Sequence, residues 1–502
     1  MIQTMVDRFR SRQLERYFPA TLVCVALGAM FISLMIGLRQ SVWFDEAYSI
    51  LLAKQSALQL VHLTSVDTHP PLYYLLLKSW AGMFGWSELA LRSLSVLAMG
   101  GAVVFGGLLA RRMFGVRMAI MALPFIALSP LLLRYGFEIR MYSLASLIGI
   151  AATYVLVLAV ETKTPSRQWK LYVIYAFLVA LGVYTLYYTV LLWLAHFIWL
   201  VFRAYRDKKP VVKTPWFMAL LGSVVLFLPW LPVFVSQVGN GALAAVSRAM
   251  TVDSLVGIVS FSFLYQPSWQ LDGYGTIIIL FIVVTVSIAF SRAFKKASKK
   301  EWDYLLLLTL YIMVPIVLIT LVSLVKPLYT ERYLSHVLIG GMLLVGIAIA
   351  YAMKKASSRM GFAVVVVYVV LILGVGQLAK IGNFNFQRMQ TPNVKEVAAE
   401  IKDECDRNTT VLASGPYVAI ELAYYLPTCE IRFYSTTDVL RGGYAGLSNS
   451  PLRIAHPSTQ LANSSRLLYV YYGKPQLMMP ANLIATSHEE RGALKLDIFS
   501  AP

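Results

Sequence analysis

The stretch F18-P-A-T-L-V-C-V-A-L-G-A-M-F-I-S-L-M-I-G-L38 decides the fold class of this chain. It contains no charged side chain. About 20 such residues are enough for a helix to cross the hydrocarbon core of a bilayer, which is roughly 30 Å thick. Four arginines precede the stretch between residues 8 and 16, and no small-residue cleavage site follows it. We therefore predict an uncleaved first transmembrane helix with its N-terminus in the cytoplasm.

The composition extends this prediction to most of the chain. Of 502 residues, 58% are hydrophobic and 14% are charged, whereas soluble proteins carry about 25% charged residues. Three cysteines are too few for a disulfide scaffold. The net charge of +19 comes from short basic clusters between apolar runs rather than from one basic face. The chain is therefore predicted to be a polytopic membrane protein whose partners include membrane lipids but no nucleic acid.

Further apolar runs predict ten more crossings. Residues 171–202 contain no Asp, Glu, Lys or Arg and have basic residues on both flanks. As a single helix they would be about 48 Å long, so we interpret them as a hairpin of two short helices turning near Tyr184–Tyr188. The other eight runs are residues 93–110, 118–133, 141–160, 214–235, 274–290, 304–325, 333–352 and 360–379. The total is about eleven helices, with the N-terminus inside and the C-terminus outside.

The distribution of basic residues supports this orientation. The proposed cytoplasmic segments contain 23 Lys and Arg residues, whereas the proposed outer loops contain nine. Basic residues concentrate in cytoplasmic loops of membrane proteins. The first outer loop, residues 39–92, is long, and its segment PPLYYLLLKSWAGMFG is apolar and lies between Pro70 and Gly85. This segment predicts a helix lying in the outer membrane interface.

The composition changes near residue 385, where charges, Pro and Asn become frequent. The segment NVKEVAAEIKDEC predicts an amphipathic helix, and TTVLASG, CEIRFYS and RLLYVYYG predict strands. We therefore expect two domains, a transmembrane catalytic domain (1–385) and a small extracytoplasmic α/β domain (386–502). Cys405 and Cys429 lie in the second domain, where an oxidising compartment would allow them to form a disulfide.

Adjacent acids open the first outer loop, in the motif S41-V-W-F-D-E-A-Y-S49. Asp45 and Glu46 lie among aromatic residues that include Tyr48, and a carboxylate at a membrane edge is costly without a partner. Such an acid could serve as a general base, bind a metal, or simply be a solvated loop residue. His69 could face the same cavity, or it could merely flank a helix. The sequence leaves open whether a divalent metal lies between Asp45 and His69, and no cofactor is certain.

Two further outer loops carry charges close to the hydrocarbon. Glu138 and Arg140 lie between two spans with almost no loop, so they face either a cavity or each other. Lys326 and Arg332 flank Glu331 at a helix start, and arginine matches the geometry of phosphate oxygens. The alternative is that they anchor the helix end at the interface. The chain has no Walker, Rossmann or zinc-ligand motif, so a nucleotide-sugar donor is not predicted.

The order of these motifs resembles a known family. An Asp-Glu pair follows the first helix, and HPPLYYLLLKSW, FEIRMYSL and ERYL come in turn. This order resembles the GT-C glycosyltransferases of the protein O-mannosyltransferase and lipid A aminoarabinose transferase type over roughly residues 18–350. The aminoarabinose branch tends to have Lys before its Pro, whereas this chain has His69. The difference favours the mannosyltransferase-like side and leaves the sugar open, hexose or pentose.

The resemblance also implies roles for individual residues. Asp45 would deprotonate the acceptor hydroxyl, with Glu46 beside it in the same loop. Arg332, with Lys326 near it and Tyr333 next in sequence, would hold the donor phosphate. Glu138 and Arg140 match the family's second-loop motif, with a structural or donor-site role. His69 and Tyr48 are the remaining candidate substrate contacts.

The expected function is therefore transfer of a sugar, with inversion, from a polyprenyl-phosphate donor to an acceptor hydroxyl. The acceptor could be a lipid, a glycan or a protein of the cell envelope, and the active site would lie on the outer face of the cell membrane. The alternative is a secondary transporter or lipid flippase without glycosyl-transfer chemistry. Transporters often show inverted repeats and acids at mid-membrane. Here the candidate charges lie at the outer edges and no repeat is evident.

Overall fold

The computed structural model divides the chain into two compact units. The first contains residues 1–37 and 92–380, and the second contains residues 38–91 and 381–502. The structure describes residues 2–239, 247, 249–354, 356–382, 394–405, 409–436, 447, 450, 452–461, 465–473, 477, 479, 481–491 and 494–501. Each unit is described by itself.

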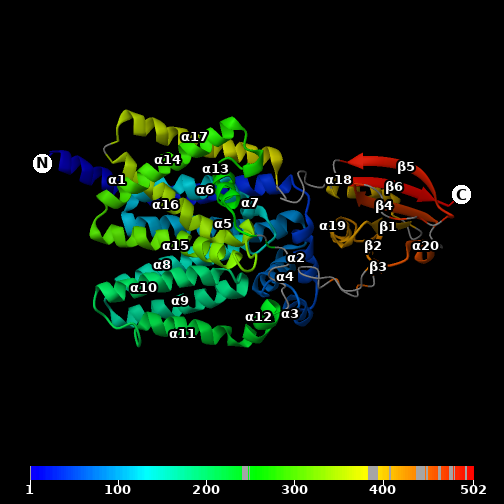
Figure 1. Ribbon diagram of the computed structural model, residues 1–502, viewed down its shortest axis with the longest axis horizontal. Coiled ribbons are helices and arrows are strands. Elements are labelled where there is room, and N and C mark those ends of the chain that lie inside the picture. The colour runs from blue at the N-terminus through cyan, green and yellow to red at the C-terminus, as the bar shows by residue number, and fades with distance from the viewer. Residues whose placement is uncertain are drawn as a thin grey trace. The chain divides into compact units, whose positions relative to one another are not determined.

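The first unit is a bundle of long apolar helices that run side by side (Figure 1). Among the described residues, nine helices are long and apolar enough to cross a membrane. A tenth crossing results if α6 and α7, which meet at a 59° bend, form one broken span. The helices are α1 (Ile2–Leu38), α5 (Glu88–Phe114), α6 (Val116–Leu128), α7 (Pro130–Phe137), α8 (Tyr142–Glu161), α9 (Pro165–Thr185), α10 (Thr189–Arg206), α11 (Pro215–Phe227), α12 (Leu231–Gly239), α13 (Val252–Phe263), α14 (Gly273–Lys296), α15 (Lys299–Ser323), α16 (Ser335–Met353) and α17 (Ser358–Ile381).

The polytopic α-helical fold is confirmed, and every predicted apolar run overlaps a helix. The predicted hairpin in residues 171–202 is present as α9 and α10, which turn at Leu186–Tyr188. Helix α10 is only 18 residues long and has two arginines in its last turn. Helix α10 is less apolar than the other spanning helices and is not among the ten crossings. Counting α10 as well would give the predicted eleven.

Helix α16 forms the centre of the bundle. It packs against α6, α8, α14 and α15, and most of its residues are buried. Its glycines allow close approach, since a Cβ added at Gly346 would lie 2.7 Å from Cα of Ala122. By contrast, α14 and α17 leave large apolar side chains exposed, such as Ile277 and Phe362. Such exposed apolar surface is expected of helices that face lipid.

The second unit combines the first outer loop with a C-terminal sheet domain. The loop forms α2 (Phe44–Lys54), α3 (Ala57–Ser65) and α4 (Leu72–Phe84), so the helix predicted between Pro70 and Gly85 is present. Gly85 ends α4 with a φ of 89°, a conformation that favours glycine. The contacts of residues 38–91 group them with residues 381–502.

The sheet domain has six strands in the order β3-β2-β1-β4-β6-β5. Strands β3, β2, β1 and β4 are parallel to one another, and β6 pairs antiparallel with both β4 and β5. The predicted helix is α18 (Val394–Ile401), and the predicted strands are β1 (Thr409–Ala413), β2 (Glu430–Tyr434) and β4 (Arg466–Tyr472). The additional elements are α19 (Pro416–Tyr425), α20 (Pro457–Gln460), β3 (Arg453–Ile454), β5 (Ile484–Arg491) and β6 (Leu494–Ser500).

Helices α18 and α19 share one hydrophobic core with the sheet, which includes Val397, Leu422 and Val470. At its edge Cys405 and Cys429 form a disulfide, with Cα atoms 5.4 Å apart. The bridge ties the segment after α18 to the segment before β2. It therefore closes a 24-residue separation in sequence.

Candidate functional site

The Asp-Glu pair lies in the first turn of α2, and both side chains are buried. Oε2 of Glu46 accepts a hydrogen bond from the backbone N–H of Trp43 at 3.2 Å. Glu46 therefore satisfies one of the donors that a helix N-terminus leaves without an intrahelical partner. This cap is a structural task. The first turn of α2 thus gives different positions to the two acids, and Asp45 is the better candidate for chemistry.

Aromatic packing fixes the start of α2 within the second unit. The ring of Phe44 lies 4.4 Å from the ring of Tyr417 in α19, centroid to centroid. Phe44 also stacks with Tyr48, with ring centroids 6.4 Å apart. The Tyr48 side chain is buried. The backbone that carries Asp45 is therefore held between α4 and the C-terminal domain, and it is not part of a loose loop.

His69 lies just before α4 and is buried together with its neighbours. Its Nδ1 is 2.7 Å from Oγ1 of Thr68, which in turn is 3.4 Å from Oδ1 of Asp67. These contacts orient the ring locally. Within the described part of the chain, no group of three or more His, Cys, Asp or Glu side chains is placed to bind a metal ion. Any metal between Asp45 and His69 would therefore need further ligands, such as phosphate oxygens of a substrate.

The second outer loop lies in the first unit. It consists of four residues between α7 and α8. Glu138 and Arg140 are both buried there. The backbone N–H of Arg140 donates to the carbonyl of Glu138 at 2.7 Å, and Oγ of Ser143 donates to the carbonyl of Tyr135 at 2.6 Å. These bonds make a tight turn that places two charged side chains in the interior of the bundle end.

Two further buried cations were not predicted as site residues. Arg92 is completely buried near the start of α5, and its guanidinium lies 5.7 Å from the ring of Phe137. Arg134 is buried in α7, and its guanidinium lies 5.1 Å from the ring of Tyr135. Both arginines adjoin apolar runs in the sequence. A charge in that position indicates a functional candidate, and this was the feature from which they could have been predicted.

The segment before α16 places Lys326 and Arg332 in different environments. Lys326 is exposed just beyond the end of α15. Arg332 is half-buried in a 3-10 turn, Glu331–Leu334, with its guanidinium 5.8 Å from the ring of Tyr333. Tyr333 is buried and packs 4.9 Å from the ring of Tyr188. The packing gives Arg332 a defined position, whereas Lys326 is less constrained.

Residues 68–232 match the family described as dolichyl-phosphate-mannose-protein mannosyltransferase. A search of curated protein sequences finds no match. The fold is similar to the crystal structure of ArnT from Cupriavidus metallidurans bound to undecaprenyl phosphate, with a TM-score of 0.64 and 13% identity. That similarity covers 95% of this chain and 97% of that one.

The same protein without ligand gives a TM-score of 0.54 at 11% identity, over 96% of this chain and 98% of that one. A crystal structure of the Archaeoglobus fulgidus oligosaccharyltransferase with zinc and sulfate has a TM-score of 0.48 and 14% identity. It covers 89% of this chain and 67% of that one. The matched family and the ArnT-like fold confirm the expected superfamily. The chain therefore has an ArnT-like fold over almost its whole length, and residues 68–232 are similar to the mannosyltransferase family.

Proposed function

We propose that this multi-pass GT-C protein transfers a sugar, with inversion, from a polyprenyl-phosphate carrier to an acceptor hydroxyl on the outer face of the membrane. The match of residues 68–232 to the mannosyltransferase family, together with the ArnT-like fold, supports a glycosyltransferase. The ArnT structure with a similar fold was solved with undecaprenyl phosphate bound, which supports a carrier of this chemical class. The single observation that carries the proposal is the buried Asp45 in the first turn of α2, beside a Glu46 that caps the helix.

The proposed chemistry needs a base for the acceptor. A hydroxyl is a poor nucleophile at neutral pH, so a carboxylate within hydrogen-bond reach contributes about 10²–10⁴-fold in rate. Asp45 takes the proton as the acceptor oxygen attacks the anomeric carbon. The bond from that carbon to the carrier phosphate breaks at the same time, on the opposite face of the sugar. The fixed backbone of α2 supplies the orientation that such a displacement requires.

The leaving group of the reaction is a phosphate, which accumulates negative charge as the bond breaks. Arginine stabilises such charge through two parallel N–H donors. Arg332 is assigned this role because it is half-buried beside the buried Tyr333, while the exposed Lys326 is a secondary contact. Arg92 and Arg134 are additional buried cations of the same unit, and Glu138 and Arg140 complete the group of buried charges there. His69 and Tyr48 are assigned to substrate contacts around Asp45.

The substitution Asp45→Asn tests the proposal, because it keeps the shape of the side chain and removes the base. We expect near-complete loss of sugar transfer, with thermal stability and donor affinity retained. Turnover near the wild-type rate in detergent with a defined acceptor would show that Asp45 is not the base. Unchanged movement of lipid carriers together with no transfer by the wild-type protein would favour a flippase.

Two further measurements complete the test. Chelation tests whether the reaction requires a metal. Loss of activity on adding a chelator alone would make Asp45 a metal ligand. A reporter that is active only in the cytoplasm, fused at the C-terminus, should stay silent. A bright signal would place the 386–502 domain in the cytoplasm.

A further inference from the structure

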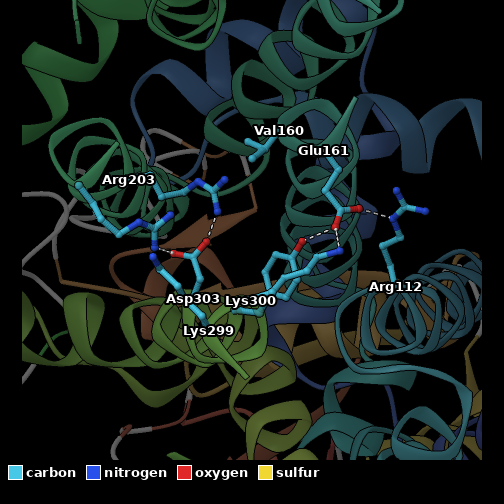
Figure 2. A pocket seen from close by; sticks show the side chains of 9 residues that line it. Arg112, Val160, Glu161, Arg203, Lys299, Lys300 and Asp303 are labelled. Atoms are coloured by element: carbon cyan, nitrogen blue, oxygen red, sulfur yellow. Dashed lines mark hydrogen bonds and ion pairs between the residues drawn. The ribbon is translucent and has the colours of Figure 1, made fainter. Parts of the chain in front are cut away.

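Four helix ends of the first unit surround a basic pocket with a volume of about 550 Å³ (Figure 2). Arg112 comes from the last turn of α5 and Glu161 ends α8. Arg203 and Arg206 lie in the last turn of α10, and α15 begins at the pocket with Lys299. The candidate active-site residues Arg92 and Arg140 are at the opposite ends of α5 and α8. Those helices are about 40 Å and 30 Å long, so the two regions are separate.

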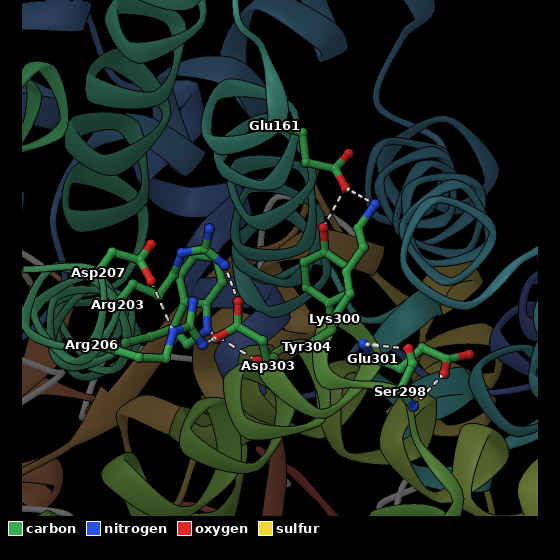
Figure 3. A network of polar contacts seen from close by, with 10 residues as sticks. Glu161, Arg203, Arg206, Asp207, Ser298, Lys300, Glu301, Asp303 and Tyr304 are labelled. Atoms are coloured by element: carbon green, nitrogen blue, oxygen red, sulfur yellow. Dashed lines mark hydrogen bonds and ion pairs between the residues drawn. The ribbon is translucent and has the colours of Figure 1, made fainter.

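Two carboxylates organise the cations around the pocket (Figure 3). The Asp303 side chain is 4% exposed and accepts from Arg203 and from Nη1 of Arg206, the latter at 3.0 Å. Glu161 is 11% exposed and pairs with Arg112 and with Nζ of Lys300, the latter at 2.7 Å. The carboxylates are buried while their partners are more exposed. The acids therefore hold the cations in place at the lining of the pocket.

The pocket retains a surplus of positive charge. Its lining contains five Lys or Arg side chains and only two carboxylates, Glu161 and Asp303. Each guanidinium has five N–H donors in a fixed fork, and the ion pairs occupy only part of them. Among the residues that the structure describes, Lys299 makes no ion pair at all. An anion with several oxygens, such as a phosphate, matches both the charge and the donor geometry.

Aromatic side chains next to the pocket indicate the source of that phosphate. Phe202 and Trp302 lie on the same two helix ends, α10 and α15, with ring centroids 6.3 Å apart. Both rings remain substantially exposed. Trp and other aromatic residues are enriched where helix ends meet the membrane interface. A phosphate held in this pocket would therefore have an apolar surface beside it, which suits a ligand with acyl chains.

We infer that this pocket binds the phosphate of an anionic phospholipid headgroup, with phosphatidylglycerol as the simplest representative. Basic pockets between transmembrane helices on the cytoplasmic side bind such headgroups, and the basic-residue count predicts that this end of the bundle lies in the cytoplasm. The proposal does not depend on the glycosyl-transfer reaction. The pocket is proposed as a lipid site that is distinct from any site for the sugar carrier.

The test uses the full-length protein in detergent and titrates phosphatidylglycerol, phosphatidylcholine and glycerol 3-phosphate while bound lipid is counted by native mass spectrometry. The double variant Arg206→Gln/Lys299→Gln leaves the Arg203–Asp303 pair intact. Its matched control is Lys209→Gln/Arg359→Gln, which removes two exposed cations outside the pocket. The single variant Lys299→Glu adds a charge reversal at an exposed position and keeps the test valid if the double variant is unstable.

We expect phosphatidylglycerol to bind more tightly than phosphatidylcholine, and the pocket double variant to lose about tenfold to thirtyfold in that affinity. The control variant should bind as the wild type does. An equal loss in the control, or no loss in either pocket variant, would overturn the site. Equally tight binding of glycerol 3-phosphate would overturn the lipid assignment and make the ligand a soluble phosphate.

Discussion

The hydroxyl of Tyr425 in α19 accepts a hydrogen bond at 2.7 Å from the backbone N–H of Val42, which lies 383 residues earlier in the chain. The same hydroxyl donates to Oε1 of Glu88 at 3.1 Å. Nζ of Lys395 lies 3.0 Å from that same carboxylate oxygen. The C-terminal domain therefore contacts both ends of the first outer loop. One contact is at Val42, three residues before Asp45, and the other is at Glu88, the first residue of α5. This contact gives the domain a structural part in positioning the proposed base.

Removing that hydroxyl should disturb catalysis more than folding. For Tyr425→Phe we expect kcat to fall about threefold to thirtyfold, because a hydrogen bond is worth about 1 kcal/mol and α2 loses a fixed starting point. The KM for the donor should change little. Tyr434→Phe in β2 is the control, since it removes a hydroxyl elsewhere in the same domain. Equal kinetics for both variants would remove the positioning role.

Glu46 should behave as a cap rather than as a second base. Gln can accept the Trp43 hydrogen bond in the same geometry, so Glu46→Gln should retain stability and most activity. Glu46→Ala should lose about 0.5–2 kcal/mol of unfolding free energy, as lost caps do. Thermal unfolding and turnover of the two variants measure this difference. If Glu46→Gln were as inactive as Asp45→Asn, the two acids would share the chemistry.

Arg332 and Lys326 should differ in their effect on the donor. Arg332→Ala removes the fixed cation and should weaken donor use by about tenfold or more, with acceptor KM nearly unchanged. Lys326→Ala removes an exposed cation and should have a milder effect. Steady-state kinetics with separately varied donor and acceptor distinguish these outcomes. An unchanged donor dependence in Arg332→Ala would exclude this residue as the phosphate ligand.

The Cys405–Cys429 disulfide should contribute to the stability of the C-terminal domain. Closing a loop of this length stabilises by about 3 kcal/mol. Quantitative thiol labelling of the unreduced, denatured protein should modify Cys24 alone, because Cys24 is the one free cysteine. Labelling of all three thiols would show that the bridge does not form in the cell. Cys405→Ser/Cys429→Ser should then match the wild type in thermal stability.

The pairing of β5 with β6 should weaken as the pH rises. Nδ1 of His488 forms a hydrogen bond with Oδ1 of Asp497, which raises the pKa of His488 above its usual range; Glu490 adds to the effect. When the pKa of a group is raised in the folded state, its stabilising effect is complete below the unfolded pKa of about 6.5. The stabilisation is lost as the pH rises through the folded-state pKa. Hydrogen exchange of the β5 and β6 amides, corrected for intrinsic rates, should become faster as the pH rises through this range. His488→Gln should abolish the pH dependence.

The sequence predicts the membrane fold well because the hydrocarbon core imposes a local rule. About 20 apolar residues must run together for a helix to cross, so runs such as 18–38 and 333–352 identify α1 and α16 without knowledge of their neighbours. The hairpin of α9 and α10 follows from the same rule applied to basic flanks. The number of crossings depends on packing at α6, α7 and α10, because a bend or a short helix decides there whether a segment spans.

The sequence by itself also determined which residues are candidates for chemistry. Charges such as Asp45, Glu138 and Arg332 lie at the ends of apolar runs, where an unpaired charge is costly. Motif order then indicated the superfamily. In the C-terminal domain, β1, β2 and β4 carry apolar patterns that predict strands. The strands β5 and β6 were not predicted, because His488, Glu489 and Lys495 interrupt the apolar pattern of their sequences.

Only the tertiary structure decided how these residues divide their tasks. A hydrogen bond to Trp43 makes Glu46 a cap, and no sequence pattern distinguishes it from the adjacent Asp45. The grouping of residues 38–91 with the C-terminal domain depends on Tyr425 and on Phe44 packing against Tyr417, residues more than 370 positions apart. The basic pocket likewise needs four helix ends to meet. Local patterns determine which segments are helices, whereas long-range packing determines which side chains become neighbours.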